Sequence, residues 1–252
     1  MPENKVSYAG QVVVITGAAR GIGAATARLV AERGGKVFAL DIARDGLTAL
    51  QKELSLPDNQ VATIDLGSQT SVKENIDAIF KLTGRIDALI NTAGVVGPTN
   101  VKVEDVKWED FESTVRINLF GTVWLTQAVV PYMKKAKYGR IAHVASIAGK
   151  EGNPKMAPYN TAKAGLIGFV KGVAKEVATD GITINSLAPA VIATPININT
   201  AKETLDYMIS KIPAGRLGEP SEVAEIIAFM GSKACSFTTG FTFDISGGRA
   251  TY

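Results

Sequence analysis

Short runs of apolar, β-branched residues alternate with longer stretches of helical periodicity along the whole chain. The first three runs are QVVVIT (11–16), KVFALD (36–41) and VATIDL (61–66), and four more follow, the last being GFTFDIS (240–246). The stretches between them are long enough for helices of about a dozen residues, which is the connection that parallel strands need. The sequence therefore predicts one α/β domain over residues 1–252, with a seven-stranded, doubly wound parallel sheet and helices on both faces.

Two connections differ from the others in length or regularity. The segment from Trp108 to Ala136 has room for one long helix, which we expect Pro131 to bend near its end. The segment at about 191–213 has prolines, Thr and Asn and only one short amphipathic piece. Because binding segments are often irregular pieces on a rigid scaffold, we expect this segment to be a flap over the site.

Composition excludes several classes of partner. The chain has 27 Lys and Arg against 24 Asp and Glu, interspersed without a basic run, which favours a small-molecule substrate over nucleic acid or a membrane. The polar start MPENKVSYAG and the lack of a long apolar run predict a cytoplasmic protein. With Cys235 and His143 as the sole residues of their types, we expect no disulfide and no metal site. We expect His143 to be a packed residue of a strand, and Trp108 and Trp124 to be core or interface anchors.

The octamer TGAARGIG (16–23) follows the first predicted strand and opens the first predicted helix. Gly17, Gly21 and Gly23 would allow a diphosphate to approach the main chain, and the helix amino terminus would offer free amide donors. The spacing differs from the common G-x-G-x-x-G pattern, so an ordinary glycine turn is the alternative for this motif alone.

Asp41 ends the second predicted strand, eighteen residues after Gly23. A carboxylate there can accept the ribose hydroxyls of NAD and repels the 2′-phosphate of NADP, so we predict NAD as the cofactor. Arg20 argues the other way, because its guanidinium could pair with that phosphate. Further cofactor contacts are expected at the ends of the third and fourth strands. These are Asp65 and Leu66 at the adenine, with a helix cap before Ser68 as the alternative, and Asn91, Ala93 and Gly94 in NTAG.

The stretch from Ser146 to Lys163 contains groups suited to proton transfer at a carbinol. Tyr159 and Lys163 are four residues apart and share a helix face, and Ser146 lies thirteen residues before Tyr159 at the end of a strand. A free tyrosine has a pKa of about 10, so a neighbouring cation such as Lys163 has the right sign to ease its ionisation. This arrangement predicts an acid–base catalyst.

Taken in order, TGAARGIG, NTAG, Asn118 in RINLFG, Ser146, YNTAK (159–163) and PAVIAT (189–194) resemble the classical short-chain dehydrogenases/reductases. The resemblance implies a Rossmann-type domain, NAD(P)-dependent redox chemistry at a carbinol or carbonyl carbon, and a homotetramer. It also implies a catalytic tetrad of Asn118, Ser146, Tyr159 and Lys163, in which Lys163 also holds the cofactor ribose and Asn118 orders a water. Further cofactor contacts would come from Ile22, Pro189, Ile192 and Thr194. The chain departs from the family's Pro-Gly at Ala190, whose Cβ resists positive φ, so we expect shifted cofactor contacts there.

The loop KEGNPKMAP (150–158) and the tail SGGRATY (246–252) are the candidate substrate determinants. Lys150, Glu151 and Asn153 would border the pocket, with a solvated loop as the alternative, and Arg249 could clamp a carboxylate. In a tetramer the tail could reach a neighbouring site. Both stretches look similar to the family branch that oxidises sugar acids such as 2-keto-3-deoxy-L-fuconate or L-rhamnonate. The alternatives are a 3-oxoacyl carrier-protein reductase that uses NADPH and, from another class, a non-catalytic NAD-binding sensor or assembly subunit.

Overall fold

Seven parallel strands form one sheet in the computed structural model, which describes residues 6–194 and 202–252. Their order across the sheet is β3-β2-β1-β4-β5-β6-β7. The strands are β1 Val12–Thr16, β2 Lys36–Asp41, β3 Val61–Thr63, β4 Ala88–Asn91, β5 Gly139–Val144, β6 Ile182–Pro189 and β7 Thr242–Ile245. The predicted seven-stranded parallel sheet is confirmed.

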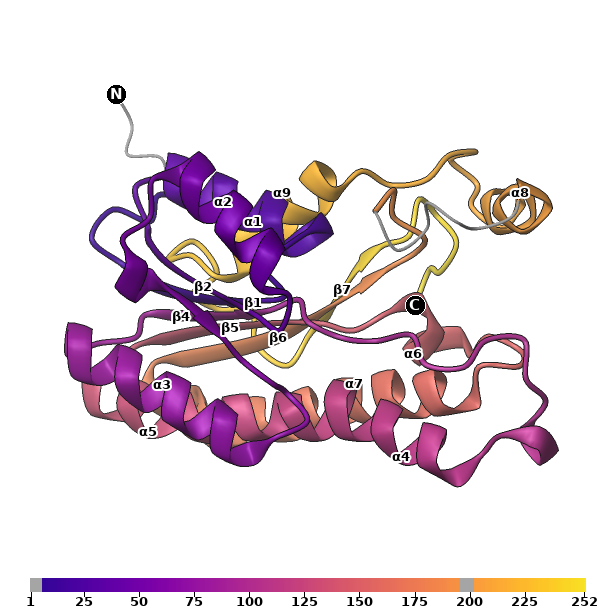
Figure 1. Ribbon diagram of the computed structural model, residues 1–252, viewed down its shortest axis with the longest axis horizontal. Coiled ribbons are helices and arrows are strands. Elements are labelled where there is room, and N and C mark those ends of the chain that lie inside the picture. The colour runs from indigo at the N-terminus through magenta and orange to yellow at the C-terminus, as the bar shows by residue number, and fades with distance from the viewer. Residues whose placement is uncertain (1–5, 195–201) are drawn as a thin grey trace.

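Helices cover both faces of this sheet, as Figure 1 shows, with α1, α2 and α9 on one side and α3, α4, α5 and α7 on the other. The helices are α1 Gly21–Glu32, α2 Arg44–Leu54, α3 Gln69–Thr83, α4 Trp108–Val115, α5 Gly121–Ala136, α6 Ile147–Glu151, α7 Ala157–Val177, α8 Lys202–Ser210 and α9 Pro220–Met230. Single turns are η1 Asp58–Gln60, η2 Val103–Asp105, η3 Arg116–Phe120 and η4 Ala178–Asp180.

Strand β1 shows why the apolar runs are nearly continuous. All five of its residues are buried, and neighbouring side chains point to opposite faces of the sheet. Val12 and Val14 pack in the core beneath α3, α5 and α7, whereas Val13 and Ile15 pack in the core beneath α1 and α9. A parallel strand between two helical layers therefore needs apolar side chains at every position.

The strand order places a crevice at the carboxyl ends of the strands. From β1 the chain proceeds outward through β2 and β3, and then returns to β4 on the other side of β1. Such a reversal leaves the loops after β1 and β4 diverging to opposite faces, and ligands of open parallel sheets bind between them. The predicted Rossmann-type topology is present.

The long helix expected from Trp108 to Ala136 is confirmed in extent, but its middle is not α-helical. The turn η3, Arg116–Phe120, is a π-helix between α4 and α5, and it contains Asn118. Pro131 lies inside α5. A π-helical turn has no simple sequence signature, and such turns occur often at functional sites.

Other details of the fold bear on single residues and on the expected flap. Trp108 is 69% exposed and is therefore not a core residue, so the interface alternative stays a prediction, whereas Trp124 packs against the core. Helix α9 begins with a capping box formed by Glu219 and Glu222. Of the expected flap at 191–213, residues 195–201 lie outside the described residues, and the part beyond them contains α8. Among the described helices none is both long and apolar enough to cross a membrane.

Candidate active site

A cavity of about 420 Å³ opens at the carboxyl ends of the strands. Its size is within the range of small-molecule sites. Most of the cofactor and catalytic residues expected from the sequence line it. These are Gly17, Arg20, Gly21, Ile22, Gly23, Asp41, Asp65, Leu66, Ala93, Gly94, Ser146, Tyr159, Pro189, Ile192 and Thr194. Among the substrate candidates, Asn153 and Arg249 also line the cavity.

The glycine turn after β1 leaves no room for side chains. A Cβ on Gly23 would lie 2.0 Å from the Gly17 carbonyl oxygen, and a Cβ on Gly17 would lie 2.6 Å from the Ala93 nitrogen. Gly17 and Gly21 also have positive φ, at 73° and 56°. The first turn of α1, which follows, contains no acidic residue. Its free amide donors and helix dipole therefore fit a diphosphate.

Asp41 stands at the end of β2 with its carboxylate next to this turn. One oxygen accepts a hydrogen bond from the Ala19 amide at 3.0 Å, and the other accepts one from the Ala43 amide at 2.9 Å. These contacts fix the orientation of the carboxylate at the cavity wall. Each carboxylate oxygen keeps further acceptor capacity, which fits a pair of ribose hydroxyls.

The residues after β3 and β4 fall into two groups. Asp65 lines the cavity and accepts a hydrogen bond from the Gly67 amide at 2.7 Å, whereas Ser68 is the cap of α3. Asn91 lies behind the cavity wall, buried between the hydroxyls of Thr16 and Thr122 at 2.7 and 2.9 Å. Its side-chain amide holds β1, β4 and α5 together and does not line the cavity, and the predicted cofactor contact of Asn91 stays a prediction.

Ser146 and Tyr159 meet in the cavity from different elements. Ser146 is the N-cap of α6, and its oxygen accepts a hydrogen bond from the Ala148 amide at 3.1 Å. Its hydroxyl proton is therefore available to the phenol of Tyr159 in the first turn of α7. Burial raises the pKa of Tyr159 above its ordinary value, and the hydrogen bond with Ser146 partly offsets that rise. The contact has the polarity needed to stabilise a phenolate.

Lys163 lies one helical turn after Tyr159 and is only 4% exposed. Its ammonium donates to the Val144 carbonyl at 2.9 Å and lies over the Tyr159 ring, 5.7 Å from the ring centroid. Burial lowers the pKa of Lys163 to about 8. The ammonium thus donates its hydrogen bond to the strand end and lies beside the Tyr159 ring, and the expected effect of this cation on the ionisation of the phenol stays a prediction.

Asn118 occupies the π-helical turn and is 1% exposed. Its amide nitrogen donates to the carbonyls of Val95 at 2.8 Å and Thr114 at 2.9 Å, and its oxygen accepts from the Val95 amide at 3.3 Å. The side chain therefore holds the loop after β4 in place. These contacts use both protons of the side-chain amide, and the expected role of Asn118 in ordering a water stays a prediction.

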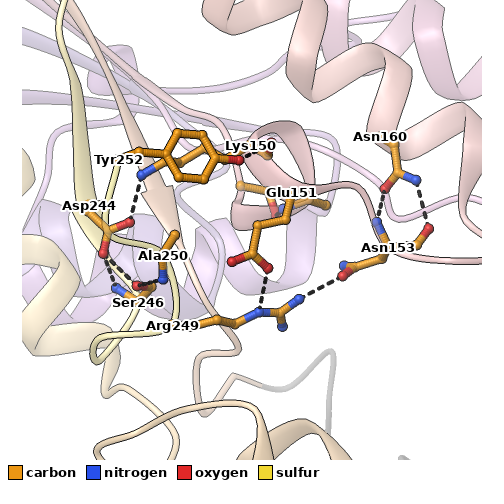
Figure 2. Close-up of polar contacts among 11 residues, drawn as sticks. Lys150, Glu151, Asn153, Asn160, Asp244, Ser246, Arg249, Ala250 and Tyr252 are labelled. Carbon is orange, nitrogen blue, oxygen red and sulfur yellow. Dashed lines mark hydrogen bonds and ion pairs between the residues drawn. The ribbon is translucent and has the colours of Figure 1, made fainter.

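Lys150 and Glu151 do not line the cavity, in contrast to their predicted place at its border. Lys150 pairs with Asp244 at 3.1 Å and has 7% of its side chain exposed, and Glu151 pairs with Arg249 at 2.9 Å. Figure 2 shows that both side chains reach across to the C-terminal tail. Their position on α6 directs them to the tail of the same chain, which sequence spacing could not show.

The corner after β6 is not strained. Ala190 is not among the residues with positive φ, and its amide donates to the Ile245 carbonyl at 3.2 Å. The backbone conformation at Ala190 is therefore open to any residue, and the expected shift of the cofactor contacts at this corner stays a prediction. Pro189, Ile192 and Thr194 all line the cavity at this corner.

Several lining residues were missed by sequence reasoning. They are mainly apolar and come from loops or helix ends: Ile42, Ile64, Val95, Val96, Ile117, Ile147, Met156, Val191 and Met208. Thr92 was also missed as a separate residue, although its hydroxyl donates to the Thr16 carbonyl at 2.8 Å and fills the space between Gly17 and Gly23. Apolar loop residues have no periodic signal, but their places next to Asp41 and NTAG could have suggested some of them.

His143 is fully buried in β5, as expected for a packed residue. The Thr126 hydroxyl donates to the Thr122 carbonyl at 2.8 Å, so the 3.0 Å contact between Thr126 and His143 has the imidazole Nε2 as donor. Burial, with a smaller contribution from the charge of Lys163, lowers the pKa of His143 to about 3. The histidine is therefore neutral at physiological pH.

Comparison with known proteins agrees with this geometry. The sequence profile of the family described as Enoyl-(Acyl carrier protein) reductase, adh_short_C2, matches residues 17–250. A 2-dehydro-3-deoxy-L-rhamnonate dehydrogenase (NAD(+)) from Sphingomonas sp. (strain SKA58) is 41% identical over 97% of each chain. A 3-oxoacyl-[acyl-carrier-protein] reductase from Thermotoga maritima is 39% identical over 95% of this chain and 97% of its own length. The crystal structure of gox2181 superposes with a TM-score of 0.93 at 30% identity, covering 99% of both chains.

The chain belongs to the short-chain dehydrogenase/reductase family. It is a nicotinamide-dependent oxidoreductase that acts on CH–OH groups of small molecules. The family resemblance drawn from the ordered motifs is thereby confirmed.

Proposed function

We propose that this protein is an NAD-dependent dehydrogenase that oxidises a secondary alcohol of a hydroxy acid of the sugar-acid type. The observation that carries the cofactor choice is Asp41, whose carboxylate is held at the cavity wall by two main-chain amides. A fixed negative charge at this place favours ribose hydroxyls over a 2′-phosphate. The sugar-acid relative, whose name specifies NAD(+), supports the same choice.

In this proposal the cofactor is held by the glycine turn, Asp41, Asp65 and the corner at Pro189–Thr194. Bound NAD supplies the hydride acceptor, and the protein positions the carbon and moves the proton. Tyr159, as the phenolate, takes the hydroxyl proton, and the single hydroxyl proton of Ser146 is donated to the substrate oxygen as its negative charge develops. Lys163 adds positive charge next to the reacting atoms, and Asn118 and Gly94 keep the loop after β4 against the site.

The second candidate is reduction of an acyl thioester with NADPH. Arg20 supports it, because this residue lines the cavity beside the glycine turn, where a guanidinium could pair with a 2′-phosphate. Relatives named as 3-oxoacyl-[acyl-carrier-protein] reductases support it as well. Asp41 opposes it, because its carboxylate would repel that phosphate.

The test is turnover by the purified protein with NAD or NADP. The substrates are secondary hydroxy acids, sugar acids and polyols in oxidation, and acyl thioesters in reduction. We expect oxidation of acids with NAD, and loss of most turnover but not of NAD binding in Tyr159→Phe. Activity confined to acyl thioesters with NADPH would select the second candidate, and full activity of Tyr159→Phe would refute the catalytic assignment.

A further inference from the structure

The half of the cavity next to Ser146 and Tyr159 is mostly apolar. Its wall includes Val95, Ile147, Met156 and Met208. Among the described lining residues the charged ones are Arg20, Asp41, Asp65 and Arg249, and the first three lie at the ends of β1 to β3. Among the described residues, Arg249 is therefore the charged one that lines the substrate side of the cavity.

The Arg249 guanidinium is held in one orientation. Its Nε donates to Glu151 Oε2 at 2.9 Å and one Nη donates to Asn153 Oδ1 at 2.8 Å, as Figure 2 shows. The side chain is 15% exposed. The other terminal nitrogen, Nη1, has no hydrogen-bond partner among residues 6–194 and 202–252. A guanidinium fixed along one edge keeps its outer edge free for an anion.

The support of Arg249 extends to the catalytic helix. Asn153 is clamped by the side chain of Asn160, which accepts from the Asn153 amide at 3.0 Å and donates to the Asn153 carbonyl at 2.7 Å. Asn160 is the residue after Tyr159 on α7. The guanidinium is thus held, through Asn153, by the same helical turn that carries the phenol. This arrangement fixes the separation between an anion site and the reacting oxygen.

The tail that carries Arg249 is also tied down. Asp244 pairs with Lys150 at 3.1 Å, and the Tyr252 hydroxyl donates to the Lys150 carbonyl. The Ser246 hydroxyl donates to Asp244 at 2.5 Å and accepts from the Ala250 amide at 3.0 Å. Contacts before and after Arg249 therefore limit the freedom that the guanidinium would lose on binding a substrate.

We propose that Arg249 is the specificity-determining residue of this site, that it binds the carboxylate of the substrate, and that Glu151 and Asn153 position it. The inference rests on the proposed function and narrows it. Among the described lining residues, the substrate side has apolar walls and one side-chain amide besides the guanidinium and the catalytic hydroxyls, which fits a short hydroxy acid with few hydroxyl groups better than a polyol. Glu151 keeps the guanidinium in place, but its own charge opposes the bound anion.

The test compares hydroxy acids with their neutral primary amides, using β-hydroxybutyrate, γ-hydroxyvalerate and a deoxy sugar acid with NAD. The wild type is expected to prefer acid over amide in kcat/KM. In Arg249→Gln this preference is expected to fall at least on the order of tenfold, because one charge-assisted contact to the carboxylate is lost. The loss should appear as a higher KM for the acid, with kcat unchanged. In Glu151→Gln, which keeps an acceptor but removes the opposing charge, the KM of the acid falls several-fold.

The matched control is Arg28→Gln on α1, which breaks an exposed two-bond pair with Glu53 of α2 and is expected to leave the preference unchanged. Unfolding midpoints and NADH binding show whether each variant is folded. An unchanged acid-to-amide preference in folded Arg249→Gln, with the wild type active on acids, overturns this inference alone. A wild type that oxidises no carboxylic acid overturns the proposed function together with it.

Discussion

The ammonium of Lys163 donates a hydrogen bond to the Val144 carbonyl at 2.9 Å and so ties helix α7 to the carboxyl end of β5. The same ammonium lies over the Tyr159 ring, 5.7 Å from the ring centroid. It places a buried positive charge at the strand end that carries Ser146. Burial lowers the pKa of this ammonium to about 8, so it is mostly charged at neutral pH. Keeping that charge buried reduces the stability of the folded chain.

Replacing Lys163 by Met separates its catalytic role from its effect on stability. Turnover is expected to fall on the order of 10²- to 10⁴-fold, because the positive charge near the proton-transfer group is lost. Stability is expected to gain relative to the wild type near pH 7, since the buried charge disappears, although one hydrogen bond worth about 1 kcal/mol is lost with it. The measurements are steady-state kinetics and urea unfolding.

The pH dependence of the free energy of unfolding, measured for wild type and Lys163→Met, provides a second check on Lys163. The folded pKa of about 8 lies below the ordinary value of 10.5, so between these two values the unfolded chain binds more protons. Wild-type stability therefore gains a contribution as pH rises through this window. The stability advantage of Lys163→Met over wild type should therefore shrink as pH rises from about 8 to 10.5, and a constant advantage would contradict the lowered pKa.

Replacing Ser146 by Ala is expected to shift the pH profile of alcohol oxidation. The hydrogen bond with Ser146 opposes the rise that burial causes in the pKa of Tyr159, so its removal raises that pKa further. The ascending limb of kcat/KM should move to higher pH and the plateau should fall. Ser113→Ala, at an exposed position on α4, is the control. If the ascending limb of the kcat/KM profile stays at the same pH, it does not reflect the ionisation of Tyr159.

Replacing Asp41 by Asn tests the choice of cofactor. The change removes the fixed negative charge and leaves one oxygen to accept from either Ala19 or Ala43. The ratio of kcat/KM for NADP over NAD is expected to rise at least on the order of tenfold, as a close charge repulsion disappears. Asp45→Asn, in the first turn of α2, is the matched control outside the cavity lining. An unchanged ratio of kcat/KM for NADP over NAD would show that Asp41 does not determine the choice of cofactor.

Replacing Gly94 by Ala is expected to reduce activity through Asn118. A Cβ at Gly94 would lie 2.5 Å from Asn118 Oδ1 and 3.5 Å from Lys163 Nζ. Either the loop after β4 or the π-helical turn must move, which displaces the wall next to Tyr159. Gly168→Ala is the control, because nothing lies within 4 Å of a Cβ there, and helix propensity predicts a gain of roughly 0.5–1 kcal/mol. Equal activity of both variants would contradict the close contact.

His143 is expected to contribute to unfolding in acid. Its folded pKa of about 3 lies below the ordinary value of 6.5, so below pH 6.5 the unfolded chain takes up a proton that the folded chain does not. As pH falls from 6.5 to about 5, this proton uptake lowers the free energy of unfolding by on the order of 1.5 kcal/mol. His143→Gln, whose amide can still donate to Thr126, should lose that part of the pH dependence in urea unfolding. A curve parallel to the wild type would contradict it.

The sequence by itself determined the order of strands and helices, because a parallel strand buried on both faces must be apolar throughout and helix α7 must carry its period of 3.6 residues. It also identified the glycine turn, Asp41, Ser146, Tyr159 and Lys163, since steric limits and proton chemistry demand particular residue types. Tertiary structure decided what lies beside them. It placed Asn91 behind the wall, gave the ammonium of Lys163 the Val144 carbonyl as its hydrogen-bond partner, and used Asn118 to hold a loop. It also turned Lys150 and Glu151 towards the tail and left Arg249 at the cavity. Those outcomes depend on contacts between residues far apart in the chain, where packing and hydrogen-bond partners are set by the folded arrangement and leave no local pattern.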